Sequence, residues 1–433
     1  MAKFEPLNTS STVVDVDHAL SNRSQGSVAN AKPLQPLQKR EVWNVIILTL
    51  CFAVGQAAVF TQISTTGIAA AEFANKDLGT VPVGSLMTVT VFCGYVIQQL
   101  LNKYSATRVY TATTLVSLVG GVLQVISTRS QSFALLTLGT AIQGFGYSAT
   151  LSCRLTVIST VPTYFAPQAI AWVLAGGALA VIGPEISRQT IDSLDDRFMG
   201  PYIAVCGFYV LLLIVVQLIQ MDAASYNVIK APVPEANVVF EEGTPARTLK
   251  QLICDPKYLS AVLASAVMYG SMSGIMNATP LEMRDVGHSF DDSTLAVQIH
   301  IVGMFVPAAG AGYVVARIGA VPTTIIGFSL FVGSTALYFI NDTTGVFSVA
   351  MFGVGLGWSL GLVGATAMLS TTFKPSEKTT AQSFNEIVMV LFLAIYVVTA
   401  SFAKTGLGWE LYLGGQMLGV GSTLVVLLLL RRC

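Results

Sequence analysis

The chain has 433 residues, of which 53% are apolar and 11% are charged, and its formal net charge is zero. An ordinary soluble domain carries roughly 25% charged residues, so this composition excludes that class and predicts a membrane protein with several spanning helices. A net charge of zero provides no electrostatic attraction for nucleic acid, and we do not expect nucleic acid as a partner.

The six cysteines are scattered, and no two of them form a CxxC pair. Four lie within apolar runs: Cys51, Cys93, Cys153 and Cys206. Such positions are typical of small buried residues rather than of a disulfide framework or a zinc site. No P-loop, HExxH or dinucleotide motif occurs in a suitable context, so we expect neither a metal nor a cofactor.

Residues 1–40 are polar and lack the apolar core of a signal peptide, which predicts a disordered cytosolic tail. After this tail, twelve runs approach or exceed the roughly 20 apolar residues that a spanning helix needs. They are Trp43–Ala71, Gly79–Leu101, Val109–Ser127, Ser132–Ser159, Ala166–Arg188, Pro201–Gln220, Tyr258–Met283, Ser293–Val315, Ala320–Ile340, Val346–Ser370, Ala381–Ala403 and Trp409–Leu430.

Residues 221–257 are the one long break between these runs. We expect them to be a cytosolic linker between a six-helix bundle at 41–220 and a second six-helix bundle at 258–433. Most of the 23 Lys and Arg residues fall on the side of the tail and linker, which predicts that both termini are cytosolic. Pro280 is expected to break the seventh helix near its outer end.

The two halves contain a repeat. The fourth run has Gly144-Phe-Gly-Tyr-Ser-Ala, the tenth has Gly355-Leu-Gly-Trp-Ser-Leu, and Ser-Thr follows at the same spacing in both. Because six spans is an even number, the second half repeats the first in parallel orientation. Parallel six-helix repeats are a known transporter architecture in which the substrate binds between the halves near mid-membrane.

Three further segments support a family resemblance. They are Ala171-Trp-Val-Leu-Ala-Gly-Gly with the later Gly183-Pro184-Glu185, Gln298 to Pro307, and Glu377 to Asn385. With these segments, residues 41–432 resemble the major facilitator superfamily, and most closely a poorly characterised, mainly bacterial branch. The resemblance implies an all-α membrane fold of twelve helices in two bundles. It also implies alternating access, a small-molecule substrate, a lipid environment and a monomer, and it suggests proton coupling.

The basic loop signature of that superfamily is present only in part. After the second helix the chain keeps Lys103 and Arg108, and the corresponding loop of the second half keeps Arg317. Neither loop contains the acidic residue that usually accompanies them. We predict Lys103, Arg108 and Arg317 as residues of this signature.

Arg154 is a charge within an apolar run, where an unpaired charge costs several kcal/mol. Two interpretations are open. The side chain could reach the headgroups from the cytosolic end of its helix, or it could form an inner gate. Glu386, near the cytosolic start of the eleventh helix, is the predicted partner, because these regions meet in this superfamily when the inside closes.

Glu185 and His300 form a second candidate pair, on the fifth and eighth helices. Both are expected toward the outer side, on helices that pack across the two halves in this superfamily. A histidine next to a carboxylate could carry a proton near neutral pH. The alternative is an interfacial hydrogen-bonded pair without a coupling role.

Four uncharged polar residues and one tryptophan are candidates for the substrate cavity. Helices one, four, seven and ten line the cavity in this superfamily, and these helices hold Gln56, Gln62, Gln143, Asn277 and Trp358. Hydrogen bonding between helices is an equally ordinary role for such amides.

Gly357-Trp-Ser359-Leu-Gly361 matches the GxSxG pattern of serine hydrolases. That motif requires a strand–turn–helix setting, and the same residues also suit a packing face of small residues. We therefore do not expect an enzyme. The sequence predicts a secondary transporter for a small organic solute, a metabolite or a xenobiotic. The alternative is a sensor with a transporter fold that binds a ligand and signals through its tail or linker.

Overall fold

The first half of the chain folds into helices at all six expected spans in the computed structural model, which describes residues 37–162, 165–221 and 246–430. The helices are α2 (Lys39–Phe73), α3 (Val81–Lys103), α4 (Ala106–Ser130), α5 (Phe133–Thr156), the pair α6 (Ala166–Ala175) and α7 (Ile182–Thr190), and α8 (Met199–Val216). Most of the predicted tail and residues 222–245 of the predicted linker lie outside the described residues.

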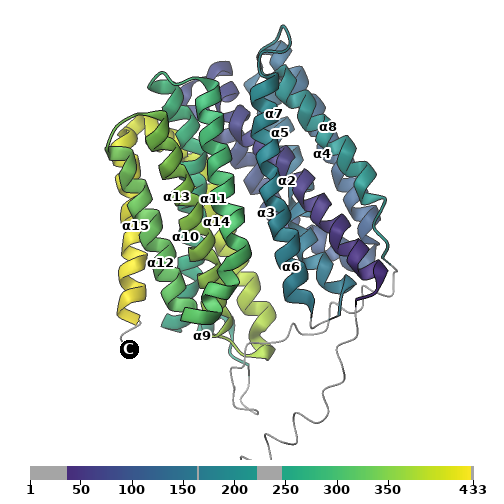
Figure 1. The fold of residues 1–433 in the computed structure, drawn as a ribbon, viewed down its shortest axis with the longest axis vertical. Coiled ribbons are helices and arrows are strands. Elements are labelled where there is room, and N and C mark those ends of the chain that lie inside the picture. The colour runs from purple at the N-terminus through teal and green to yellow at the C-terminus, as the bar shows by residue number, and fades with distance from the viewer. Residues whose placement is uncertain (1–36, 163–164, 222–245, 431–433) are drawn as a thin grey trace, which may run out of the picture. The chain divides into compact units, whose positions relative to one another are not determined.

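The second half repeats this pattern after the short helix α9 (Leu249–Ile253). Its helices are α10 (Pro256–Asp285), α11 (Phe290–Ile318), α12 (Ala320–Ala336), α13 (Thr344–Ser370), α14 (Lys378–Leu407) and α15 (Trp409–Leu430). Figure 1 shows the first-half helices in purple to teal and the second-half helices in green to yellow. The described residues contain no strand.

Eleven helical segments in the described part of the chain are long and apolar enough to cross a membrane. The predicted fourth span is not among them, although its residues form the 24-residue helix α5. The reason is the polar side of α5, which holds the buried residues Thr140, Gln143, Ser148 and Ser152. α5 packs along both α3 and α4, so protein neighbours and not lipid surround that side.

The predicted fifth span is not one regular helix. The 3-10 segment η4 (Gly176–Val181) separates α6 from α7. A Cβ atom on Gly177 would lie 2.5 Å from the ring of Phe305, and one on Gly183 would lie 2.3 Å from the carbonyl oxygen of Ala57. Glycine at these two positions therefore lets the fifth span approach α11 and α2 closely.

The predicted break at Pro280 is wrong, because α10 continues through Pro280 to Asp285. Proline removes one backbone donor from a helix, but side chains can hydrogen-bond the carbonyl groups of the preceding turn. Here the Thr279 hydroxyl donates to the carbonyl of Ile275, and the Asn277 amide donates to that of Ser273. Thr279 and Asn277 thus bond the backbone just before the proline.

The segment that matches GxSxG lies in the middle of α13. Gly361 packs against Gly327 of α12, and a Cβ atom on Gly327 would lie 2.2 Å from the Gly361 nitrogen. Ser359 is buried. The glycines let α12 and α13 approach closely. The setting is a helix, without the strand and turn that a nucleophile elbow requires.

The most extensive contacts between the first-half helices and the second-half helices are three. α3 packs against α14, α2 packs against α10, and the fifth span packs against α11. These pairs bring residues that are hundreds of positions apart in the sequence to one interface.

Candidate functional site

The interface between the two halves is closed at one end, which we call the Thr80 end after its central residue. The Thr80 amide donates to the Ser401 hydroxyl at 3.2 Å, and the two hydroxyl oxygens are 2.8 Å apart. One turn further into α3, a Cβ on Gly84 would lie 2.4 Å from Val398. The start of α3 and the end of α14 therefore touch directly, without space for a solute.

Ion pairs surround this contact. Lys76 in the first half pairs with Asp285 in the second at 2.6 Å, and Arg284 in the second pairs with Glu72 in the first at 3.2 Å. Lys404 is only 5% exposed and also pairs with Asp285, at 2.5 Å. The pairs Lys76–Asp285 and Arg284–Glu72 cross the interface, so they link the two halves at the Thr80 end.

Glu185 and His300 do not contact each other in the described structure. The Glu185 carboxylate accepts from Arg188 at 2.5 Å and, across the interface, from Gln298 at 3.0 Å. His300 is buried on another side of α11, and its Nδ1 lies 2.8 Å from the carbonyl oxygen of Met351. Proton coupling through Glu185 and His300 stays a prediction and is not part of the function proposed below.

Three glutamines from α2, α4 and α5 form a closed ring of hydrogen bonds, which we call the glutamine ring. Gln62 donates to Gln143, Gln143 donates to Gln124 at 2.7 Å, and Gln124 donates to Gln62 at 3.2 Å. All three side chains are buried. Each amide thus donates and accepts within one bundle, which matches the interhelical role for Gln62 and Gln143.

A cluster of aromatic side chains lies on α2, α5, α10 and α13, where α2 packs against α5 and α10, and α10 packs against α13. The rings of Tyr269 and Trp358 are 5.6 Å apart with an angle of 52°. Tyr147 is buried, lies beside Gln56 and is within electrostatic range of Tyr269 and Arg154. We call these five residues the aromatic cluster. Gln56 and Trp358 are the predicted cavity residues that the fold brings into it.

Arg154 and Glu386 both lie within electrostatic range of Tyr269, from opposite halves of the chain. They form no ion pair among the described residues, and the Arg154 Nε atom is buried without a hydrogen-bond partner there. The two predicted gate residues therefore lie near the same ring without an ion pair between them, and the gate stays a prediction.

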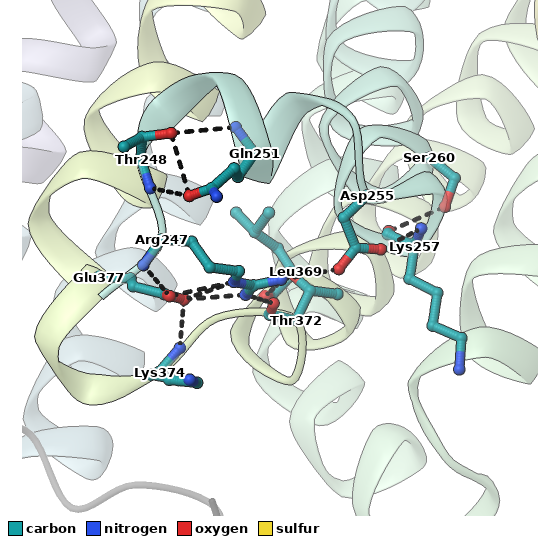
Figure 2. A network of polar contacts seen from close by, with 10 residues as sticks. All are labelled: Arg247, Thr248, Gln251, Asp255, Lys257, Ser260, Leu369, Thr372, Lys374 and Glu377. Atoms are coloured by element: carbon teal, nitrogen blue, oxygen red, sulfur yellow. Dashed lines mark hydrogen bonds and ion pairs between the residues drawn. The ribbon is translucent and has the colours of Figure 1, made fainter. Parts of the chain in front are cut away.

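The end of the bundles opposite Thr80, which we call the Glu377 end, carries a second charge network. The Glu377 side chain has no exposed surface, and it accepts from the Arg247 guanidinium at 2.8 Å and from the backbone nitrogens of Arg247 and Lys374. Arg247 also pairs with Asp255 at 2.9 Å and donates to the carbonyl of Thr372 (Figure 2). These bonds, the Arg247 guanidinium foremost, lower the pKa of Glu377 from 4.5 to about 2.

The loop-signature residues are exposed. Lys103 lies over the ring of Tyr104 at 5.6 Å, Arg317 donates to the Tyr313 hydroxyl at 2.8 Å, and Arg108 projects from the start of α4. In the described part of the chain, none of the ion pairs involves these three cations. This agrees with the missing acidic residue of the signature.

Comparison with known proteins identifies the family. The model of the Major Facilitator Superfamily matches residues 52–389, well over half of the chain. The chain belongs to the Major Facilitator Superfamily. It is therefore an integral, multi-pass membrane protein of a transporter family, whose members bind small molecules within the bilayer.

The chain is similar to several known transporters. The riboflavin transporter RfnT of Brucella anthropi is 28% identical over 371 residues, covering 85% of this chain and 90% of that protein. An uncharacterised transporter of Bacillus subtilis, YdeG, is 22% identical over 382 residues, covering 85% and 86%. A solved structure of a mutant of the nucleoside transporter NupG has a TM-score of 0.67, covers 90% of this chain and 100% of that one, and is 14% identical. At that identity, the likeness to NupG concerns the fold alone.

Tyr147 and Tyr269 were missed by sequence reasoning. Gln143, Tyr147 and Arg154 are spaced by four and seven residues, which places them on one face of α5. That spacing from a charge within an apolar run could have indicated Tyr147. No comparable local signal exists for Tyr269, because its neighbours along α10 are apolar or small.

Proposed function

We propose that this chain is a secondary transporter that carries a flavin, or a closely related planar heteroaromatic solute, by alternating access. The observation that carries this proposal is the aromatic cluster, in which two tyrosines and one tryptophan from both halves lie near the buried Gln56 amide and the half-buried Arg154 guanidinium. Aromatic rings stack on planar heterocycles with about 1–3 kcal/mol per base in single-stranded nucleic acids. The similarity to a riboflavin transporter supports the same substrate class.

The closed Thr80 end supports alternating access. By the predicted orientation this end faces outward, so the conformation would be one in which the outside is sealed. In that state a solute held by the aromatic cluster would exchange with the cytosol through the Glu377 end. The opposite state requires the Thr80–Ser401 contact to separate.

Riboflavin uptake into cells or vesicles tests the proposal. We expect uptake above background for the wild type, and Tyr269→Leu should reduce it about tenfold, because a stacking ring is lost from the cluster. Tyr104→Leu is the matched control, since Tyr104 is exposed at the end of α3 and should keep uptake. Absence of riboflavin uptake by well-folded wild-type protein would contradict the flavin assignment. A protein that binds riboflavin without accumulating it would favour the sensor.

We also propose that Arg154 and Glu386 pair to close the inside when the Thr80 end opens. Both lie near Tyr269 from opposite halves, and the present conformation leaves them unpaired. Arg154→Glu and Glu386→Arg should each abolish most uptake, because like charges then face each other. The double swap should restore a substantial part of it. If the double swap is as inactive as the single variants, the two residues do not form the gate.

A further inference from the structure

Three polar atoms of the aromatic cluster are buried and have no hydrogen-bond partner among the described residues. They are Oε1 of Gln56, Nε of Arg154 and Nε1 of Trp358. Leaving such a group unpaired costs about 1–3 kcal/mol, and folded proteins rarely do so without a reason. Three such atoms in one cluster indicate that a bound molecule completes their hydrogen bonds.

The chemistry of these atoms specifies what that molecule must present. Arg154 and Trp358 can only donate at the named nitrogens, whereas the Gln56 oxygen can only accept. The set is therefore two donors and one acceptor. An imide has the complementary arrangement, because its N–H donor lies between two carbonyl acceptors.

We propose that the aromatic cluster recognises the imide edge of a pyrimidinedione ring, with Gln56 accepting from the ring N3–H and Arg154 and Trp358 donating to the flanking carbonyls. This inference rests on the function proposed above and deepens it, because the isoalloxazine ring of a flavin carries such an edge. The same edge occurs in lumazine and in uracil derivatives. Gln56 is thus assigned as the residue that selects for an unsubstituted N3.

Gln56, Tyr269 and Trp358 each lie near the middle of a long helix. At about 1.5 Å per residue, Gln56 lies about 26 Å along α2 from Lys39, Tyr269 about 20 Å along α10 from Pro256, and Trp358 about 18 Å along α13 from Ser370. All three helix ends are at the Glu377 end. Arg154 is two turns from Tyr147, and side chains lean toward the N-terminus of their helix. The Arg154 guanidinium is thus directed back toward Tyr147 and the cluster.

The rings explain how the site can be both present and shielded. Tyr269 and Trp358 contact each other, and Tyr147 is buried beside Gln56. A planar ligand would enter by parting these side chains, a rotamer change that commonly accompanies binding. Its ring would then be held on the aromatic faces while its edge satisfies the three buried atoms.

The test is a binding titration with the purified full-length protein, in which the quenching of flavin fluorescence reports binding. Riboflavin is compared with 3-methylriboflavin, whose N3 cannot donate a hydrogen bond. We expect wild-type protein to bind riboflavin at least tenfold more tightly than it binds 3-methylriboflavin. Gln56→Leu should weaken riboflavin binding about tenfold and leave binding of the methylated flavin unchanged. Gln217→Leu, a change at an exposed glutamine of α8, should alter neither.

The outcomes separate the two proposals. Equal affinity of wild-type protein for riboflavin and 3-methylriboflavin would overturn recognition of the imide edge and leave flavin transport standing. Lumazine and thymidine, each with its N3-methyl derivative, are measured in parallel by thermal stabilisation. If one of these binds more tightly than its N3-methyl derivative and riboflavin does not bind, recognition of the imide edge stands and the flavin assignment is refuted.

If no imide binds, both proposals are wrong. Because the ligand pair is compared on wild-type protein, a failure of Gln56→Leu to fold does not affect this test.

Discussion

Thr80→Cys combined with Ser401→Cys is expected to form a disulfide that abolishes uptake, and a thiol reductant should restore it. The two hydroxyl oxygens are 2.8 Å apart, from opposite halves of the chain, so sulfur atoms at these positions are close enough to bond. The bond would hold the Thr80 end closed. A carrier that must open this end in each cycle then cannot turn over, and the expected loss is complete rather than partial.

The measurement is uptake before and after oxidation in a background with Cys254→Ser, which removes the one native cysteine that is exposed among the described residues. Ser64→Cys with Ser187→Cys is the matched control. These hydroxyls are 3.1 Å apart on α2 and α7, within the first half of the chain, so their disulfide should leave uptake intact. Undiminished uptake by fully cross-linked Thr80→Cys/Ser401→Cys protein would show that the Thr80 end does not open during transport.

Glu377→Gln is expected to lower the free energy of unfolding by about 3 kcal/mol, because it removes the negative partner of a buried ion pair. The Glu377 side chain has no exposed surface and accepts bonds from Arg247 and Lys374. The loss should be near the lower end of the range for such pairs, since Asp255 still faces Arg247 at 2.9 Å. Thermal unfolding of the purified variant measures it, and Glu410→Gln, at an exposed position, is the control.

The same carboxylate predicts a dependence of stability on pH. Its pKa in the folded protein is about 2, compared with 4.5 ordinarily, so folding favours the ionised form. The stabilisation is therefore fully present above pH 4.5 and is lost as the pH falls from 4.5 toward 2. Wild-type protein should lose stability over this window more steeply than Glu377→Gln. Parallel curves for the two proteins would show that Glu377 is not held ionised by Arg247.

Much of the fold follows from local composition. Helices that cross lipid must be long and apolar, because the bilayer offers no partner for backbone polar groups, and this rule makes spans visible in a sequence. The run Ser132–Ser159 shows where the rule is weakest. Its helix, α5, is more polar than the other spanning helices, and α3 and α4 cover its polar side, yet the run was long enough to be predicted as a span.

The functional site was harder to predict from the sequence than the helices were. Gln56, Gln62 and Gln143 are the same kind of residue in the same kind of helix, and the family resemblance made all three cavity candidates, with hydrogen bonding between helices as the alternative. In the structure Gln62 and Gln143 satisfy each other within the glutamine ring, whereas Gln56 keeps an unpaired oxygen in the aromatic cluster. The difference depends on the rotation of each helix and on the side chains that face it.

The number, length and apolar character of the helices could be predicted from the order of residues, and so could the presence of an arginine within an apolar run that needs an explanation. The pairing of polar groups across helices could not. Thr80 meets Ser401, Arg247 meets Glu377, and Tyr269 meets Trp358 through contacts between distant segments. A buried polar group bonds to whatever neighbour the packing of helices places beside it, and that neighbour leaves no local mark in the sequence.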